Sequence, residues 1–244
     1  MRYAIRWVMS LLFSLQTYVM MFVFAIALLP WAIINRNGAF AAIHIWCRWV
    51  RWTASWMIGL KSEVRGEVPQ GEVMVASKHQ SFFDIILLCS VLPRPKFIMK
   101  KQLVWAPIVG WYAKRVGCVP VDRGRRGAAI KAMVEQVRAG TSEPGQLIIF
   151  PQGTRVAAGA KQDYKVGVAV LYSELNSPVV PVSCNVGVFW PRHRVYREPG
   201  LAVIRFEPTI EPGLPKREFL AEIERVIEAG SNALMRDAGF DVEV

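Results

Sequence analysis

The stretch VMVASKHQSFFDIILLCSVL, residues 73–92, decides the fold class of this chain. Its first five residues, Val73–Ser77, are mostly apolar and include two β-branched valines, as in a buried strand. A polar loop follows, and Phe82–Leu92 is then an apolar segment of helical length. A strand that leads through a short loop into a helix is the repeating unit of an α/β sheet, so this stretch predicts one.

The same alternation continues along the chain. We expect further strands at Lys96–Met99, Val116–Val121, Leu147–Phe150, Val179–Asn185 and Ala202–Phe206. We expect further helices near Trp105–Arg115, Ala128–Ala139, Val166–Leu175 and Lys216–Ala238. The sequence therefore predicts an α/β fold with a mostly parallel central sheet flanked by helices. In such sheets functional residues gather in the loops after the carboxyl ends of the strands.

The composition favours a folded protein that meets a membrane. Of the 244 residues, 53% are hydrophobic and 20% are charged, and the mean hydropathy of +0.27 is high for a fully soluble enzyme. These values exclude a disordered chain, a collagen and a coiled coil. The net charge of +11 implies an anionic partner: nucleic acid, a phosphorylated substrate or an acidic lipid surface.

The charges and the tryptophans divide the chain near Gly59 to Lys61. Residues 1–60 hold five arginines, no acidic residue and six of the nine tryptophans, whereas residues 61–244 hold all 19 acidic residues. We expect residues 1–60 to form a two-helix membrane anchor and residues 61–244 to form the α/β domain.

The first predicted helix is long enough to cross a bilayer. Trp7 to Ile34 is free of charge, and the part up to Leu29 would be about 35 Å of helix at 1.5 Å per residue. A cleaved signal peptide is the competing interpretation, because Ala25-Ile26-Ala27 resembles a cleavage site. The apolar run continues past that site and exceeds the usual apolar region of about 7–15 residues, which favours a retained anchor.

The second predicted helix begins at about Ala39 and is amphipathic. His44, Arg48, Arg51 and Ser55 recur on one face, and Ile45, Trp49, Trp52 and Trp56 lie on another. We assign His44 to this polar face, with no chemical role. Because arginines precede the first helix, lie between the two helices and line the second, the sequence leaves open whether the module spans the membrane or dips into one leaflet.

The four cysteines are expected to be buried, reduced thiols: Cys47, Cys89, Cys118 and Cys184. They are widely spaced, with no C-x-x-C pattern and no histidine at the spacing of a zinc site. We therefore expect no bound metal.

The loop after the first strand carries a candidate general base. His79 and Asp84 stand five positions apart where the strand gives way to a helix, so the carboxylate can orient the imidazole while its free nitrogen takes a proton. No G-x-S-x-G nucleophile accompanies the pair, so the nucleophile would be a hydroxyl of the substrate. Ser81-x-x-Asp84 is also a helix capping box, which is the purely structural alternative for Asp84.

Two further loops offer groups that bind phosphate. Residues 150–155, FPQGTR, supply a glycine turn, backbone N–H groups, a hydroxyl and the guanidinium of Arg155. Residues 117–124, GCVPVDRG, supply Arg123, and Lys100, Lys101 and Lys165 lie near other strand ends. The alternative is that these are solvated surface charges.

The ordered blocks HQSFFD, GCVPVDRG, FPQGTR and VVPVSCN together resemble the glycerolipid acyltransferase family, specifically the bacterial 1-acyl-sn-glycerol-3-phosphate (lysophosphatidic acid) acyltransferases. The resemblance covers residues from about 70 to 190. It includes the connecting segment around Lys100-Lys101-Gln102-Leu103, and the family also shares an N-terminal two-helix membrane motif.

The resemblance implies a reaction and its residues. His79 would deprotonate the free hydroxyl of a lysophospholipid, Asp84 would orient His79, and the alkoxide would attack an acyl thioester of acyl carrier protein or coenzyme A. No metal, cofactor or covalent enzyme intermediate is needed. The glycerol phosphate would be bound by Arg155, Gly153 and Thr154, with help from Arg123 and from Lys100 or Lys101. The implied place is the bacterial inner membrane with the site on the cytoplasmic face.

The chain departs from the family pattern at two positions. Gln152 and Gln102 stand where the family usually has glutamate, which keeps hydrogen-bonding capacity and removes a charge. We keep Gln152 as a candidate binding residue. His193 is assigned with Arg192, Arg194 and Arg197 to a basic surface loop that could touch acidic lipid or acyl carrier protein.

Other functions remain open at this point. The acceptor could be glycerol-3-phosphate or a lyso-ornithine lipid, and a different class is a non-catalytic basic module that binds membranes. Nucleic acid is disfavoured, because the bases are spread through the chain and no recognition motif accompanies them.

Overall fold

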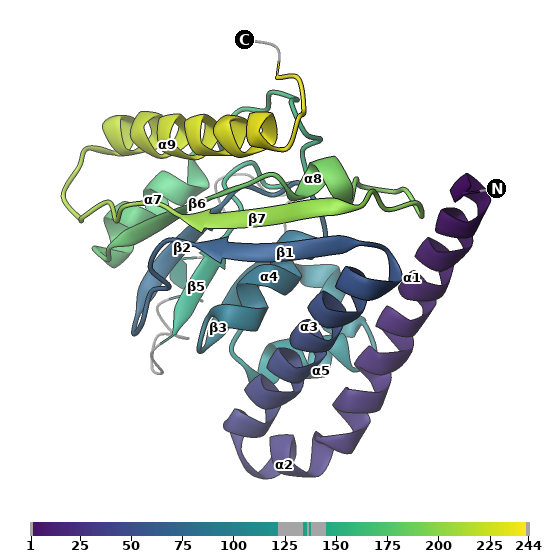
Figure 1. Cartoon of the computed structure of the whole chain (residues 1–244). Helices are drawn as coiled ribbons and strands as arrows, with labels where there is room; N and C mark the ends of the chain where they lie inside the picture. Colours follow the sequence, from purple (N-terminus) through teal and green to yellow (C-terminus); the bar gives the residue numbers. More distant parts are fainter. Residues whose placement is uncertain (1, 122–133, 136, 138–144, 243–244) are drawn as a thin grey trace.

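The computed structural model describes residues 2–121, 134–135, 137 and 145–242. They form a seven-stranded sheet in the order β1-β7-β6-β2-β5-β3-β4, with helices on both faces (Figure 1). The strands are β1 (Leu60–Arg65), β2 (Val73–Ser77), β3 (Pro95–Lys100), β4 (Val119–Val121), β5 (Gln146–Ile149), β6 (Val179–Cys184) and β7 (Gly200–Phe206). Neighbouring strands are parallel except β6 and β7, so the predicted mostly parallel sheet is confirmed.

Two strands differ from the prediction. β1 was not expected, because its sequence LKSEVR has no apolar run and only Leu60 is fully buried. β4 begins at Val119 rather than Val116, because α5 reaches Arg115 and Gly117 turns the chain with a φ of 84°. That φ lies in the left-handed region, which glycine adopts at little cost.

The helices of the described residues include the predicted ones in their order, and the short helices α2 and α8 were not predicted. They are α1 (Arg2–Ala27), α2 (Leu29–Ile34), α3 (Arg36–Met57), α4 (Phe83–Val91), the 3-10 helix η1 (Lys101–Trp105), α5 (Val109–Arg115), α7 (Gly167–Leu175), α8 (Val186–Phe189) and α9 (Lys216–Asp237). The helix expected over 105–115 is two pieces, η1 and α5, with Pro107 between them. Most of the helix expected at 128–139 lies outside the described residues.

Alternate strand residues bury into two separate cores. Val75 and Ile148 belong to the core shared with α3 and α4, whereas Met74, Ala76 and Leu147 belong to the core beneath α7 and α9. This period of two is that of strands with both faces covered. Figure 1 shows the result: α9 and α7 lie above the sheet, and α3 and α4 lie below it.

The N-terminal helices pack on each other and on the α/β body. Gln16 Nε2 of α1 donates to Thr53 Oγ1 of α3 at 3.0 Å, and the ring of Phe13 contacts that of Trp190 at 5.4 Å. α3 begins at Arg36 rather than Ala39, because the Asn35 side chain caps its first turn. The loop between α1 and α3 is itself the short helix α2.

The four cysteines are free thiols, as predicted. Cys47, Cys89 and Cys184 are buried and Cys118 is half-buried. Burial raises the pKa of the Cys118 thiol to about 12, so it is an inert packing group at neutral pH.

Candidate active site

The predicted site loops meet at one edge of the sheet. β5 lies between β2 and β3, and all three run parallel. The residues that follow Ser77, Ile149 and Lys100 therefore emerge at the same edge. This is the edge at which the sequence places His79, the 150–155 loop and the two lysines.

His79 and Asp84 are in direct contact. The His79 Nδ1 atom lies 3.0 Å from Asp84 Oδ1, and Asp84 Oδ2 accepts the backbone N–H groups of Gln80 and Ser81, both at 2.8 Å. Asp84 is completely buried, whereas 13% of the His79 side chain is exposed. The pair thus presents an oriented, partly accessible imidazole whose Nδ1 is held by a buried carboxylate.

The His79 loop and the 150–155 loop hold each other. The imidazole stacks on the Phe150 ring with centroids 3.9 Å apart, and Val156 N–H donates to the His79 carbonyl at 2.8 Å. The predicted base and the predicted phosphate loop therefore form one unit.

The 150–155 loop is a tight glycine turn. Gly153 has a φ of 72° and donates its N–H to the Phe150 carbonyl at 2.9 Å. Thr154 is exposed and Arg155 is half-buried. Among the described residues the Arg155 guanidinium has no carboxylate partner, so it is available to an anion.

The other predicted cations lie in different environments. Lys100 ends β3 and Lys101 begins η1, and both are exposed and follow the strand next to β5. Arg123 lies outside the described residues. His193 and Arg194 are exposed as expected, but Arg197 is buried, with its guanidinium 4.4 Å above the Trp190 ring.

The prediction that Arg197 belongs to the exposed basic loop is therefore wrong. Burial lowers the pKa of Arg197 to about 10, and its backbone N–H donates to Ser10 Oγ of α1. This arginine joins α1 to the α/β body.

Gln152 is buried beneath the loop, unlike the exposed Thr154 and the half-buried Arg155. Only 2% of it is accessible, and its Nε2 donates to the Gln162 carbonyl at 3.2 Å and to Glu228 Oε1 at 3.4 Å. That Gln152 binds substrate stays a prediction. The contacts that it makes in the structure are with Gln162 and Glu228, which lie beneath the loop.

The residues beneath the two loops include three that the sequence analysis did not predict as site residues: Lys78, Tyr164 and Glu228. Lys78, next to His79, is buried with its Nζ 2.5 Å from Glu228 Oε1, and the Tyr164 hydroxyl donates to the same oxygen at 3.0 Å. Burial and the adjacent Glu228 raise the pKa of Tyr164 far above its usual range, which keeps it a donor. Glu228 comes from α9, 150 positions after Lys78, so no local pattern could reveal it.

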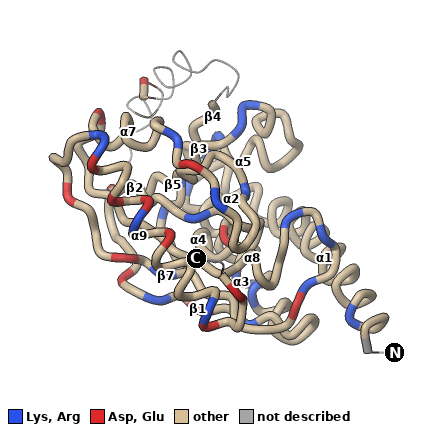
Figure 2. The backbone as a smooth tube through the Cα atoms, turned by 90° about the horizontal axis from the view of Figure 1, so that it is seen from above, with Lys and Arg blue, Asp and Glu red and all other residues tan. Residues whose placement is uncertain are grey.

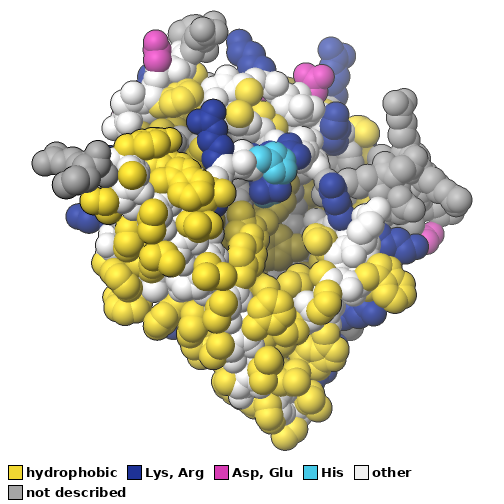
Figure 3. Space-filling view, turned by 90° about the vertical axis from the view of Figure 1, so that its right-hand side faces the viewer, with side chains coloured by type: hydrophobic (Ala, Val, Ile, Leu, Met, Phe, Trp, Pro, Cys, Tyr) yellow, Lys and Arg dark blue, Asp and Glu magenta, His cyan; other side chains and the backbone are white. Residues whose placement is uncertain are grey.

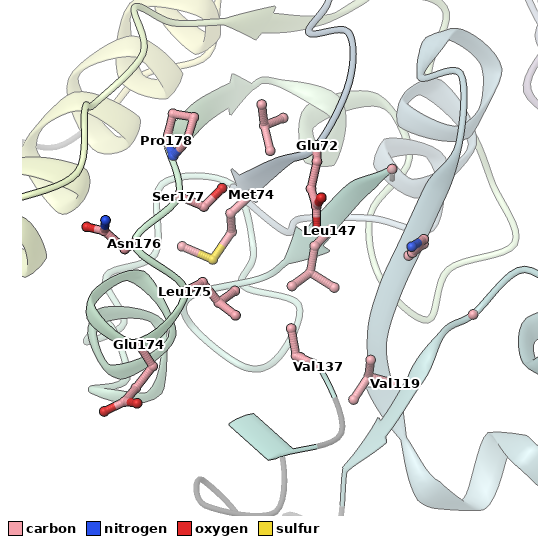
Figure 4. A pocket seen from close by; sticks show the side chains of 14 residues that line it. Glu72, Met74, Val119, Val137, Leu147, Glu174, Leu175, Asn176, Ser177 and Pro178 are labelled. Atoms are coloured by element: carbon pink, nitrogen blue, oxygen red, sulfur yellow. The ribbon is translucent and has the colours of Figure 1, made fainter. Parts of the chain in front are cut away.

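The molecule also has a pocket of about 540 Å³ at the opposite edge of the sheet (Figure 4). It is lined by residues at the amino ends of the strands, among them Met74, Leu147 and Pro178. Since the His79 loop follows the carboxyl end of β2, this pocket is not part of the candidate site.

A hollow opens on the face that includes α1 (Figure 3). Apolar side chains lie within and below it, and Lys and Arg side chains gather around its upper part. A surface that combines these features suits a molecule with an acidic head and an apolar tail.

Known proteins resemble this chain in sequence and in fold. A family model described as Acyltransferase matches residues 61–185. The chain is 26% identical over 197 residues to the 1-acyl-sn-glycerol-3-phosphate acyltransferase of Pseudomonas aeruginosa, which covers 80% of this chain and 77% of that protein. It is 33% identical over 131 residues to the human 1-acyl-sn-glycerol-3-phosphate acyltransferase alpha, covering 52% of this chain and 46% of that protein.

The fold is also that of a solved enzyme. The crystal structure of the 1-acyl-sn-glycerophosphate (LPA) acyltransferase PlsC from Thermotoga maritima superimposes with a TM-score of 0.80 over 96% of this chain and 98% of that chain, at 22% identity. The predicted fold class is thereby confirmed.

Because the family model matches more than half of its residues, this chain belongs to the acyltransferase family. It is an enzyme, and the family expected from its sequence blocks is the right one.

Proposed function

We propose that this enzyme transfers an acyl chain to the sn-2 hydroxyl of 1-acyl-sn-glycerol-3-phosphate and so makes phosphatidic acid. The observation that carries the proposal is the buried Asp84 paired with His79, beside a loop whose Arg155 has no carboxylate partner among the described residues. The names of the relatives support the acceptor, since the proteins from Pseudomonas aeruginosa and human are both named for it.

His79 acts as the general base. With Nδ1–H donated to Asp84, the lone pair of Nε2 takes the proton of the acceptor hydroxyl. The hydroxyl oxygen then attacks the carbonyl carbon of the acyl thioester, and the carbon–sulfur bond breaks. The departing thiolate receives the proton from the imidazolium, so His79 returns to its starting state.

The acceptor phosphate binds at the 150–155 loop. Arg155 provides a planar pair of N–H donors, and the exposed Thr154 hydroxyl and the Gly153 turn lie next to it. Lys100 and Lys101 add positive charge from the neighbouring strand end, and Arg123 is proposed to do the same. This distribution favours a phosphate acceptor over a lyso-ornithine lipid.

The acyl donor is a thioester of acyl carrier protein or coenzyme A. Both are acidic molecules, and the exposed bases His193, Arg192 and Arg194 offer a matching surface. The reaction as written needs no metal or cofactor.

The enzyme works at a membrane surface. One described helix, Tyr3–Ala27, is long and apolar enough to cross a membrane by length and composition. Its outer face exposes large apolar side chains such as Leu15 and Ile26, and Trp52 and Trp56 are exposed on α3. We propose the bacterial inner membrane, with anionic lipids as partners and the site on the cytoplasmic side.

The test is acyl transfer by purified protein in detergent, with lysophosphatidic acid as acceptor and each thioester as donor. We expect His79→Ala to lower kcat by about 10²- to 10⁴-fold, the usual contribution of a general base, and Arg217→Ala, at an exposed position at the start of α9, to leave kcat within about twofold. Full activity in His79→Ala would overturn the role of His79. A folded wild type that acylates glycerol-3-phosphate or a lyso-ornithine lipid instead would overturn the acceptor.

A further inference from the structure

Lys78 carries a buried charge directly beside the proposed base. Only 2% of its side chain is accessible, and its Nζ lies 2.5 Å from Glu228 Oε1. A buried ammonium group without a partner is strongly unfavourable, so the conformation of Lys78 depends on this carboxylate. Lys78 immediately precedes His79, so the backbone that presents the imidazole depends on it too.

The same carboxylate oxygen gathers two other segments. Glu228 Oε1 accepts the Tyr164 hydroxyl at 3.0 Å and the Gln152 amide at 3.4 Å. Gln152 belongs to the 150–155 loop, and Lys78 to the loop of the base. One residue of α9 therefore contacts both loops of the candidate site from beneath.

The amide at position 152 matches this arrangement. Its two neighbours, the Gln162 carbonyl and Glu228 Oε1, are both acceptors, so the group that faces them has to donate. A glutamate at position 152 would put a second carboxylate against both. The amide of Gln152 therefore fits beside the carboxylate that α9 supplies.

α9 holds the other neighbour of His79 as well. Gln80 Nε2 lies 3.4 Å from Met235 Sδ, and Gln80 Oε1 accepts the Gly187 N–H at 2.9 Å. Glu228 and Met235 are seven positions apart, about two helical turns, and so lie on the same face of α9. Lys78 and Gln80 therefore both contact one face of α9, while His79 between them contacts Phe150 and Asp84.

We propose that Glu228 is a positioning residue for acyl transfer, whose carboxylate fixes the loop of His79 through Lys78 and the loop of Arg155 through Gln152. Glu228 supplies the negative charge that pairs with Lys78, and the neutral Gln152 contacts the same carboxylate oxygen. We expect one carboxylate at either position to serve, but not one at both. The proposal rests on the function given above for His79.

The test is a charge exchange. We expect Glu228→Gln and Gln152→Glu each to lower kcat/KM for lysophosphatidic acid roughly 10- to 100-fold, because small displacements of reacting groups have effects of that size. The double variant Gln152→Glu/Glu228→Gln restores the single charge and is expected to regain about tenfold over Glu228→Gln. Glu222→Gln, the same change at a surface ion pair with Arg225 on the same helix, is the matched control and stays at the wild-type value.

A second readout needs no substrate. The chain has three histidines, so the ring resonances of His79 can be assigned by NMR of histidine-labelled protein in detergent with His79→Asn as reference. We expect these resonances to move in Glu228→Gln and to return toward wild type in the double variant. If the wild type does not acylate lysophosphatidic acid, the proposed function fails while this shift and its reversal still support the positioning role.

Two results would overturn the positioning role. One is a double variant that is no better than Glu228→Gln in activity and in the His79 resonances. The other is a Glu228→Gln protein with a lower unfolding temperature but unchanged kcat, KM and His79 resonances, which would make Glu228 a stabilising residue only.

Discussion

The two oxygens of Asp84 contact different partners. Oδ1 meets the imidazole of His79, and Oδ2 accepts two backbone N–H groups at the start of α4. The sequence left capping and orientation of the base as alternatives, and the geometry allows both because a carboxylate has acceptor sites on each oxygen. The capping contacts fix the carboxylate, and a fixed carboxylate fixes the ring.

At the same scale, Arg155 is expected to govern affinity for the acceptor. Replacing it with alanine removes a charged, two-pronged donor, so KM for lysophosphatidic acid is expected to rise about 10- to 100-fold with a smaller effect on kcat. Arg155→Lys keeps the charge without the planar guanidinium, so its KM should lie between those of the wild type and Arg155→Ala. Steady-state kinetics in detergent micelles measure this.

The control for Arg155 is Arg217→Ala, which removes an exposed arginine at the start of α9 and should leave KM unchanged. An Arg155→Ala enzyme with wild-type KM would place the phosphate elsewhere.

The helices and strands that the sequence predicts are those with a continuous apolar run or a clear apolar repeat. β2, β5 and β6 are buried on both faces, so they appear as apolar runs, and α9 matches the expected range to within one residue. β1 lies at the edge of the sheet with polar residues along its length and was missed. Its pairing with β7 joins segments 140 positions apart, which no local pattern encodes.

The residues of the site also divide into those that the sequence predicts and those that it does not. His79, Asp84 and the 150–155 loop are each local in sequence and follow strands, so spacing predicts them. Glu228 and Tyr164 act through contacts between distant parts of the chain. Since α9 carries residues of both charges along its length (Figure 2), nothing in the sequence marks Glu228 as different. Contacts between residues so far apart in the sequence can be identified only from the folded structure.

His44 joins two elements, and its titration should be visible in stability. Its Nε2 lies 2.9 Å from the Leu92 carbonyl, which ties α3 to the end of α4. Burial lowers the pKa of His44 below 6.5, against the raising effect of that hydrogen bond, and the charge of Arg48 lowers it further. The unfolded state then binds the proton more readily, so stability is complete above about pH 6.5 and is lost as the pH falls toward the lowered value.

We therefore expect the unfolding temperature to fall between pH 7.5 and pH 5.5, and to fall less in His44→Gln, which does not titrate. Tryptophan fluorescence during heating in detergent measures it. His193→Gln, at an exposed position, is the control and should keep the wild-type slope. Equal slopes for wild type and His44→Gln would contradict the assignment.

On the scale of the whole molecule, α1 is bound to the α/β body along its first half. Tyr3 stacks on Tyr196 at 5.3 Å, Ser10 Oγ accepts the Arg197 N–H, and Phe13 packs on Trp190. A helix that crossed the bilayer away from the body would have to break these contacts. The apolar outer face of α1 and the tip at α2, where 84% of Ile34 is exposed, remain free to enter one leaflet.

This packing predicts that both ends of α1 lie on the side of the membrane that holds the α/β body. Single cysteines at the exposed positions Ala4 and Asn37 are therefore expected to escape a membrane-impermeant maleimide in intact cells, as does a cysteine at Glu218 on α9. After the membrane is opened, Glu218→Cys should label fully, and the wild type gives the background of its own four thiols.

Labelling of Ala4→Cys from outside would mean that α1 alone crosses the bilayer, and labelling of Asn37→Cys would mean that α1 and α3 cross as a hairpin. Either result would require α1 to leave the contacts with Tyr196 and Trp190 when the enzyme meets the membrane.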